Sequence, residues 1–241
     1  MEYANYEALR EKILGRGVVV AIDGPSGSGK STISRSVAAA LDLGYLDTGA
    51  MYRAAAWGVE HRGVDLNNPI AIAAAMQTMK FTVNAVPHAP RILVDGVDVM
   101  HVIRTDHINT IVSAVSSVPE VRTMLIALQR DIIAQARQST RGIVVEGRDI
   151  TTVVAPEAQV RILLTADEAT RVSRRALEDQ GDARSETLDR ERSLVLDRDA
   201  RDAKVTSFHV AADGVATVDS TDLSVSQTLD TVMRLIDQAT N

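Results

Sequence analysis

The sequence contains no cysteine, which excludes disulfide bonds, thiolate metal sites and a cysteine nucleophile. Aromatic residues make up only 3% of the chain, which argues against single-strand binding by base stacking. The chain also lacks an excess of positive charge, since its net charge is −6. Duplex binding depends on Lys and Arg neutralising phosphates, so nucleic acid is not an expected partner. A local basic cleft for a small anion is compatible with this charge.

Long apolar segments are missing too. No uninterrupted apolar run approaches the roughly 20 residues of a membrane helix, so no membrane association is predicted. Residues 1–17 lack a basic start followed by an apolar block, so they do not resemble a secretory signal. Tyr6, Leu9 and Ile13 have roughly helical spacing. We therefore expect an N-terminal arm or short helix at 1–17 and a cytoplasmic protein.

The 241 residues suffice for one large domain, or for one domain with an insert. The composition, 45% hydrophobic and 24% charged, is that of a globular protein. Residues 18–22 form a continuous apolar run, which is typical of a strand buried on both faces. A glycine-rich turn follows, and then Ile33, Val37 and Leu41 recur every four residues. The predicted order is strand, glycine loop, helix.

The second half of the chain continues this alternation. Further buried strands are predicted at 143–145, 160–164 and 215–218. Helices are predicted at roughly 167–180, 185–203 and 224–238. Strands that alternate with helices favour an α/β fold built on a parallel sheet flanked by helices.

The segment from 80 to 103 has a different pattern. Apolar residues alternate with polar ones on both sides of Asp95-Gly96, and Asp-Gly between such runs is a strong hairpin signal. Residues 81–83 fit a third strand. We therefore predict a small antiparallel insert at about 75–125, within a core formed by 18–74 and 126–241.

The glycine loop carries the clearest motif. Residues 24–31 match G-x-x-x-x-G-K-S/T in full, with a strand before and a helix after. In such a loop the backbone N–H groups and the helix N-terminus surround phosphate oxygens. Lys30 would reach the β- and γ-phosphates, Ser31 would ligate Mg²⁺, and Thr32 would assist at the α-phosphate. The predicted triphosphate-binding residues here are Gly24, Pro25, Ser26, Gly27, Ser28, Gly29, Lys30, Ser31 and Thr32.

Arginines and carboxylates gather at three further places. Residues 46–53 read Leu-Asp-Thr-Gly-Ala-Met-Tyr-Arg, and the guanidinium of Arg53 is suited to bidentate binding of a phosphate. Residues 144–149 end a predicted parallel strand, where open α/β sheets place their ligands. Basic residues also recur on a predicted helix at Arg171, Arg174 and Arg175, and again at 198–204. The chain lacks the N-K-x-D run that GTPases use to read guanine.

Taken together, the motifs at 23–31, 46–53 and 146–149 resemble the bacterial cytidylate kinase family of P-loop nucleoside monophosphate kinases. Residues 112–116 and 119–122 are similar to that family's nucleotide-reading segment. The resemblance covers roughly 18–238. It implies a P-loop NTPase fold with an NMP-binding insert and a helical lid at about 171–207. It further implies transfer of the γ-phosphoryl group of ATP, with Mg²⁺, to CMP or dCMP by a monomer.

The resemblance also implies roles for individual residues. Lys30, Arg53 and Arg148 would be catalytic, with the two arginines holding the acceptor phosphate. ATP would also contact Arg174 and Arg175, whereas Mg²⁺ would be held by Ser31 and, through water, by Asp47 or Glu146. The residues implied for CMP are Thr48, Tyr52, Arg53, Ser113, Arg122, Arg148, Asp149, Arg198, Asp202 and Lys204. No general base is needed, because the acceptor phosphate is already anionic.

Three departures from the family pattern stand out. Glu146 replaces a frequent Asp, residues 150–153 lack a glycine that commonly follows Asp149, and Lys204 stands near a usual Arg. Two alternative functions remain open at this point. One is a related kinase with another acceptor, such as UMP, AMP or a non-nucleotide. The other is a nucleotide-binding regulator without catalysis.

Overall fold

The computed structural model describes residues 5–139, 142–180, 188, 192–193, 195–196, 199–200, 203, 206 and 208–241. A five-stranded sheet, parallel throughout, forms its centre in the order β2-β6-β1-β7-β8. The strands are β1 (Val18–Asp23), β2 (Gly44–Asp47), β6 (Gly142–Gly147), β7 (Val160–Thr165) and β8 (Ala216–Asp219). The parallel α/β sheet expected from the sequence is confirmed.

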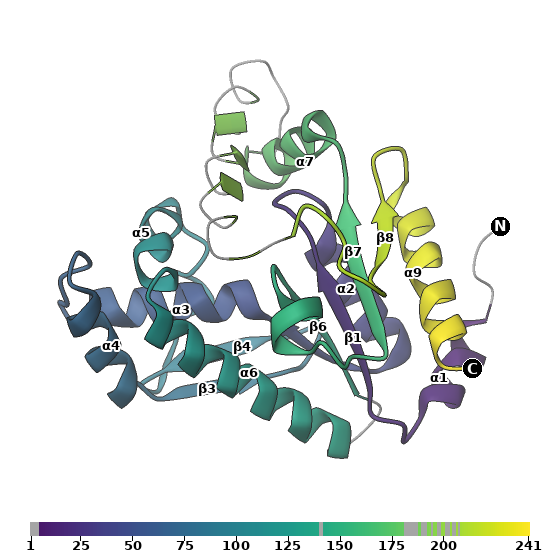
Figure 1. Ribbon diagram of the computed structural model, residues 1–241, viewed down its shortest axis with the longest axis horizontal. Coiled ribbons are helices and arrows are strands. Elements are labelled where there is room, and N and C mark those ends of the chain that lie inside the picture. Colours follow the sequence, from purple (N-terminus) through teal and green to yellow (C-terminus); the bar gives the residue numbers. More distant parts are fainter. Residues whose placement is uncertain are drawn as a thin grey trace.

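Helices cover both faces of this sheet (Figure 1). Alternate β1 residues, such as Val18 and Val20, share one buried cluster with α1, α2 and α9. Val19 and Ala21 belong to the opposite cluster, with α3 and α6. Because successive strand residues point to opposite faces, the continuous apolar run of β1 needs both layers. These helices are α1 (Tyr6–Ile13), α2 (Lys30–Leu41), α3 (Thr48–His61), α6 (Pro119–Ser139) and α9 (Val225–Ala239).

A small antiparallel sheet lies between α3 and α6 in the sequence and has the order β3-β4-β5. Asp95 and Gly96 connect β4 to β5 with φ of 50° and 85°, as the Asp-Gly signal predicts for a tight hairpin. The elements of this insert are α4 (Pro69–Thr78), β3 (Phe81–Asn84), β4 (Arg91–Val94), β5 (Val97–Asp98) and α5 (Asp106–Ser116).

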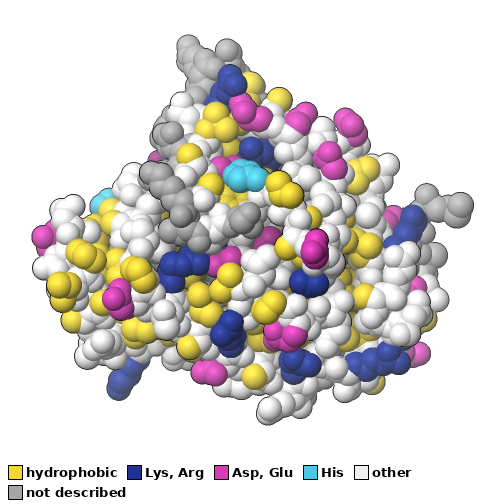
Figure 2. Space-filling model, viewed as in Figure 1, with side chains coloured by type: hydrophobic (Ala, Val, Ile, Leu, Met, Phe, Trp, Pro, Cys, Tyr) yellow, Lys and Arg dark blue, Asp and Glu magenta, His cyan; other side chains and the backbone are white. Residues whose placement is uncertain are grey.

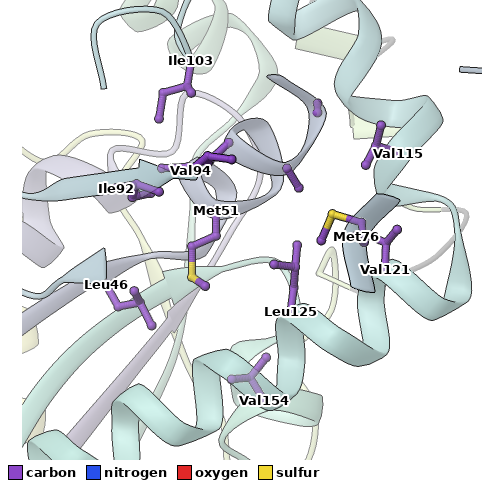
Figure 3. Close-up of a cluster of buried hydrophobic side chains, with 14 of the residues drawn as sticks. Leu46, Met51, Met76, Ile92, Val94, Ile103, Val115, Val121, Leu125 and Val154 are labelled. Carbon is purple, nitrogen blue, oxygen red and sulfur yellow. The ribbon is translucent and has the colours of Figure 1, made fainter. Parts of the chain in front are cut away.

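One buried cluster joins the insert to the core (Figure 3). Met51 of α3, Met76 of α4, Val94 of β4, Val115 of α5 and Leu125 of α6 all belong to it. The insert is therefore packed against the core by its own side chains and by those of α3 and α6. The predicted boundaries near residues 75 and 125 stay predictions, and α4 and α6 run across them.

The N-terminal segment forms the helix α1, which packs beside α9. The Tyr6 hydroxyl donates to Asp230 at 3.0 Å, and Lys12 Nζ donates to Asp237 at 2.6 Å. At the carboxyl edge of the sheet, β7 leads into α7 (Glu168–Gln180), as predicted. Most of the predicted helix 185–203 lies outside the described residues.

No single described helix is long and apolar enough to cross a membrane. The pair α5 and α6, bent by 102°, passes that test of length and composition only when taken together. Both helices contribute residues to the buried cluster of the insert, which accounts for their apolar faces. On the face shown in Figure 2, basic and acidic side chains are interspersed.

Candidate active site

The glycine loop connects β1 to α2 at the carboxyl edge of the sheet. Gly27 and Gly29 have φ of 75° and 86°, the left-handed region that glycine enters without steric cost. A Cβ on Gly27 would lie 2.4 Å from the carbonyl oxygen of Arg171, so no larger residue fits there. Because α2 begins at Lys30, its free N–H groups and its dipole favour a phosphate at this point.

A cavity of 170 Å³ opens beside this loop. The basic side chains that line its described part are Lys30, Arg53, Arg104, Arg122, Arg148 and Arg175. Its carboxylates are Asp47, Glu146 and Asp149. Cations gathered in a cleft attract a polyanion such as a nucleotide, even on a chain of negative net charge.

The cavity gathers most of the residues that the sequence predicts for the site. Its lining also includes Ser26, Gly27, Gly29, Ser31, Thr32, Thr48, Tyr52 and Ser113. Among the described residues, those predicted for the site but placed outside the lining are Gly24, Pro25, Ser28 and Arg174. Arg174 instead donates to the side chain and the carbonyl of Ser220, at 2.9 and 2.7 Å. The predicted Arg198, Asp202 and Lys204 lie outside the described residues.

Arg53 lies on α3 and is buried, with 9% of its surface exposed. Its Nε donates to the side-chain oxygen of Asn109 at 3.2 Å, a partner that the sequence analysis missed. Burial lowers the pKa of the Arg53 guanidinium, Asp47 opposes this, and neighbouring arginines add to the lowering. A guanidinium crowded by other cations favours an anion beside it, and its planar donors match a phosphate.

Arg148 forms an ion pair with Asp199, a residue of the segment predicted to be the lid. Its guanidinium donates to the Gly24 carbonyl and, at 3.2 Å, to Asp199. Asp199 also accepts from Arg171 at 2.5 Å and from the Ser26 backbone N–H at 3.0 Å. Asp199 is buried, with 4% exposed. The sequence analysis did not single it out, because its charged surroundings are typical of a solvated helix face.

The residues predicted to read a base form one polar wall. Arg122 donates to Asp149 at 2.5 Å, and its guanidinium carbon lies 5.9 Å from the Tyr52 ring centroid. The Tyr52 hydroxyl is buried and has no hydrogen-bond partner among the described residues. Burial raises the pKa of Tyr52 to about 12, so this hydroxyl stays neutral near pH 7. Ser113 lines the same cavity and supplies a second hydroxyl.

Glu146 is a buried residue near the end of β6, and it contacts Ser31 at the start of α2. One of its carboxylate oxygens accepts from Ser31 Oγ at 2.8 Å, and the other accepts from the Tyr45 hydroxyl. Burial raises the pKa of Glu146, nearby Asp47 raises it further, and Lys30 opposes the rise. The hydroxyl and the carboxylate are hard oxygen donors, the ligands that Mg²⁺ prefers, so this pair fits a magnesium site.

Asp47 pairs in register with Glu146 across β2 and β6 but has other partners. One of its oxygens caps α3 by accepting from the Ala50 N–H at 2.8 Å. The other accepts from Arg104 at 3.0 Å. Of the two carboxylates predicted for the metal, Glu146 is thus the one bonded to Ser31.

The turn after Asp149 lacks the glycine common in the family and forms a short π-helix, η1 (Ile150–Val154). Asp23, at the end of β1, holds this turn. Its carboxylate accepts from the N–H groups of Ile150 and Thr151, both at 2.8 Å, and from the Thr151 hydroxyl at 2.7 Å. The strand that begins the phosphate loop therefore also fixes the segment that follows Arg148 and Asp149.

Comparison with known proteins identifies the family of this chain. Residues 20–238 match the family model described as cytidylate kinase. The cytidylate kinase of Streptomyces griseus is 47% identical over 91% of this chain and 93% of its own length. Those of Streptomyces avermitilis and Nocardia farcinica are each 45% identical over 92% of this chain, and over 93% and 94% of their own lengths.

Among solved structures, TT1252 from Thermus thermophilus aligns with 92% of this chain and 98% of its own. The sequence identity is 18% and the TM-score is 0.43, so this similarity is distant and supports no inference about chemistry. The family model and the curated relatives both span more than nine-tenths of the chain. This chain therefore belongs to the cytidylate kinase family.

Proposed function

We propose that this protein transfers the γ-phosphoryl group of ATP to CMP or dCMP, giving ADP and CDP or dCDP. The observation that carries the proposal is a single cavity that combines three parts. It joins a phosphate loop with Lys30, an acceptor pair formed by Arg53 and Arg148, and a polar wall formed by Arg122 and Asp149. The curated relatives of this chain, which are named cytidylate kinase, support the same proposal.

The residues act by positioning and by charge. An oxygen of the acceptor phosphate attacks the γ-phosphorus, the bond from that phosphorus to the β–γ bridging oxygen breaks, and ADP leaves with the electron pair. Lys30, Arg53 and Arg148 neutralise the charge spread over the transferring group. No side chain needs to remove a proton, because the attacking oxygen is already anionic.

We propose that Mg²⁺ is bound by Ser31 and, through water, by Glu146. The ion would neutralise charge on the phosphates of ATP. The carboxylate of Glu146 orients the Ser31 hydroxyl by accepting its hydrogen. Asp47 is engaged as a helix cap and by Arg104, so it is the weaker candidate of the two.

We assign the acceptor base to the wall beside η1. Arg122 offers planar donors, Asp149 offers acceptors, and the hydroxyls of Ser113 and Tyr52 can do either. Such mixed donors and acceptors suit the edge of a cytosine, which carries an amino group beside a ring nitrogen and a carbonyl. Thr48, also assigned to CMP, is held in place by its own hydrogen bond, which its hydroxyl donates to the Glu146 carbonyl at 2.8 Å.

Further assignments rest on the family resemblance. We propose that Arg175, which lines the cavity, contacts ATP phosphates and that Arg174 lies at the ATP side of the loop. Arg198, Asp202 and Lys204 remain assigned to CMP by resemblance alone. We also propose that the protein acts as a monomer in the cytoplasm, without nucleic-acid or membrane partners.

The test is ADP formation from Mg·ATP with CMP, dCMP, UMP, AMP and GMP, each supplied separately. We expect fast turnover with CMP or dCMP and little with the purine nucleotides. Turnover with UMP or AMP instead would assign a different acceptor to the same cavity. Binding of ATP without any acceptor-dependent ADP formation would indicate a nucleotide-binding regulator and would contradict the proposal.

A further inference from the structure

Tyr45 places a polar group at a point of the core where strand residues are expected to be apolar. It lies on β2, and only 1% of its surface is exposed. Its hydroxyl donates to one oxygen of Glu146, which is also 1% exposed. A buried tyrosine hydroxyl needs a partner, and here that partner is a carboxylate of the candidate site.

The second oxygen of Glu146 leads to the phosphate loop. It accepts the hydrogen of Ser31 Oγ at 2.8 Å. A hydroxyl that gives its hydrogen to a carboxylate turns its lone pairs the other way, where they can face a cation. The direction of the Ser31 lone pairs thus depends on where the Glu146 carboxylate is held.

Two hydroxyls, one on each oxygen, fix the rotation of the Glu146 carboxylate. Without the Tyr45 bond, the terminal torsion of a glutamate is broad and about two-fold. Arg35 of α2 lies over the ring face of Tyr45, with its guanidinium carbon 5.4 Å from the ring centroid. The chain of contacts therefore runs from α2 through β2 and β6 back to the loop.

We propose that Tyr45 is a positioning residue for the metal site, which acts through Glu146 to fix the Ser31 hydroxyl and so strengthens the binding of Mg²⁺ with ATP. This inference rests on the proposed function. It also gives a physical reason for glutamate at 146. An aspartate there would be shorter by one C–C bond, about 1.5 Å, and would not span from Ser31 to the Tyr45 hydroxyl.

The test is Tyr45→Phe, which keeps the ring in the core and removes one hydroxyl. Binding of Mn²⁺, a spectroscopic substitute for Mg²⁺, is measured by electron paramagnetic resonance on the full chain with a non-transferable ATP analogue. We expect about tenfold weaker Mn²⁺ binding, the lower end of losses seen when partners of metal ligands are removed. The Mg²⁺ concentration needed for half-maximal rate should rise by a similar factor.

The matched control is Tyr6→Phe, which removes the hydroxyl that donates to Asp230 between α1 and α9. It should leave Mn²⁺ binding unchanged. Binding of the ATP analogue in excess chelator, and binding of CMP, should be unchanged in Tyr45→Phe as well. An equal weakening of all three ligands would mean that Tyr45 only supports the fold, and it would overturn the inference.

A double-mutant cycle with Glu146→Asp tests whether Tyr45 acts through Glu146. In the Glu146→Asp background, Tyr45→Phe should have no further effect on Mn²⁺ binding. Full additivity of the two changes, or unchanged Mn²⁺ binding in Tyr45→Phe alone, overturns the inference. The proposed function is judged separately, because wild-type protein without CMP-dependent turnover would fail the acceptor panel whatever the Mn²⁺ measurements give.

Discussion

The parallel sheet and the antiparallel insert position their side chains by different means. Every residue of β1 and β6 is buried, and the register between these strands places the end of β1, where the phosphate loop begins, beside Glu146 and Gly147 of β6. In the insert, β3 and β4 are only partly buried, and the sheet has just three short strands. The phosphate loop is thus placed mainly by main-chain pairing, and the insert mainly by side-chain packing.

The contact between α3 and the insert illustrates the second mode. A Cβ on Gly58 would lie 2.6 Å from Met79 Sδ and 2.9 Å from Val94 Cγ1. Near it, Arg62 donates to Asp95 at 2.5 Å and to the Ala75 carbonyl at 2.8 Å. This contact between α3 and the insert depends on the fit of side chains and on a few polar contacts. Single substitutions there should therefore each lower the stability by a modest amount.

The largest effect is expected on the parallel-sheet side, from Lys30→Ala. This change removes a cation that neutralises the transferring phosphoryl group, so kcat/KM for ATP should fall by about 100- to 1000-fold. Steady-state kinetics with saturating CMP would measure it. Lys80→Ala is the control, since Lys80 is exposed beside β3 and should leave the rate unchanged. A loss below tenfold for Lys30→Ala would contradict the role of the loop lysine.

The next effect concerns the polar wall formed by Arg122 of the insert and Asp149 of the core. Arg122→Ala or Asp149→Ala should lower kcat/KM for CMP by about 10- to 150-fold, because the partner left behind is a partly or fully buried charge without its counter-ion. KM for ATP should change little. Arg137→Ala, an exposed position on the same helix, is the control. Unchanged preference for CMP over UMP and AMP in both variants would remove the base-reading assignment.

A decrease in stability is expected from Gly58→Ala, at the contact between α3 and the insert. The added Cβ collides with Met79, and overpacking of this kind costs about 1–3 kcal/mol, partly offset by about 1 kcal/mol of helix propensity. The loss should be smaller when Met79→Ala is present, because the added Cβ then collides only with Val94 Cγ1, at 2.9 Å. Thermal unfolding of the four proteins measures both steps. Destabilisation of equal size in both backgrounds would show that the collision is not the cause.

The smallest effect is a pH dependence at the hairpin. The backbone N–H of Lys80 and the Arg62 guanidinium hold the pKa of Asp95 below its ordinary value of 3.8. A lowered folded pKa gives stability that is present above pH 3.8 and is lost as the pH falls through the folded value. Asp95→Asn keeps a residue suited to the turn and should remove at most about 1 kcal/mol at pH 6, and less near pH 3.

Melting curves of wild type and Asp95→Asn between pH 2.5 and 6 test this difference. A gap between the two proteins that widens toward low pH would have the wrong sign and would reject the assignment.

Local signals in the sequence predicted what short-range physics determines. A few neighbouring residues are enough to predict the strand at 18–22, the glycine loop and the Asp95-Gly96 turn. The parallel α/β fold predicted from such signals is confirmed. The family resemblance is confirmed as well. The site residues themselves stay predictions, although the fold brings most of them to one cavity.

What the sequence did not reveal depends on contacts between distant residues. Asp23 holds η1 across 127 positions, Asp199 reaches Ser26 across 173, and Tyr45 reaches Glu146 across 101. Each of these residues has an ordinary local explanation as a strand end, a solvated charge or a core aromatic. Only the tertiary fold, which brings β1, β2 and β6 together and places Asp199 beside the phosphate loop, gives them their partners.

The central place of β1 also determines how the protein fluctuates. β1 is paired along both edges, to β6 from Val18 to Asp23 and to β7 from Val20 to Asp23. Opening its last residues requires both neighbours to separate, so their amide hydrogens should exchange with water only through global unfolding. The short β4–β5 pair should exchange through local opening. We therefore expect the floor of the phosphate loop to open only together with the core, and the β4–β5 hairpin of the insert to open on its own.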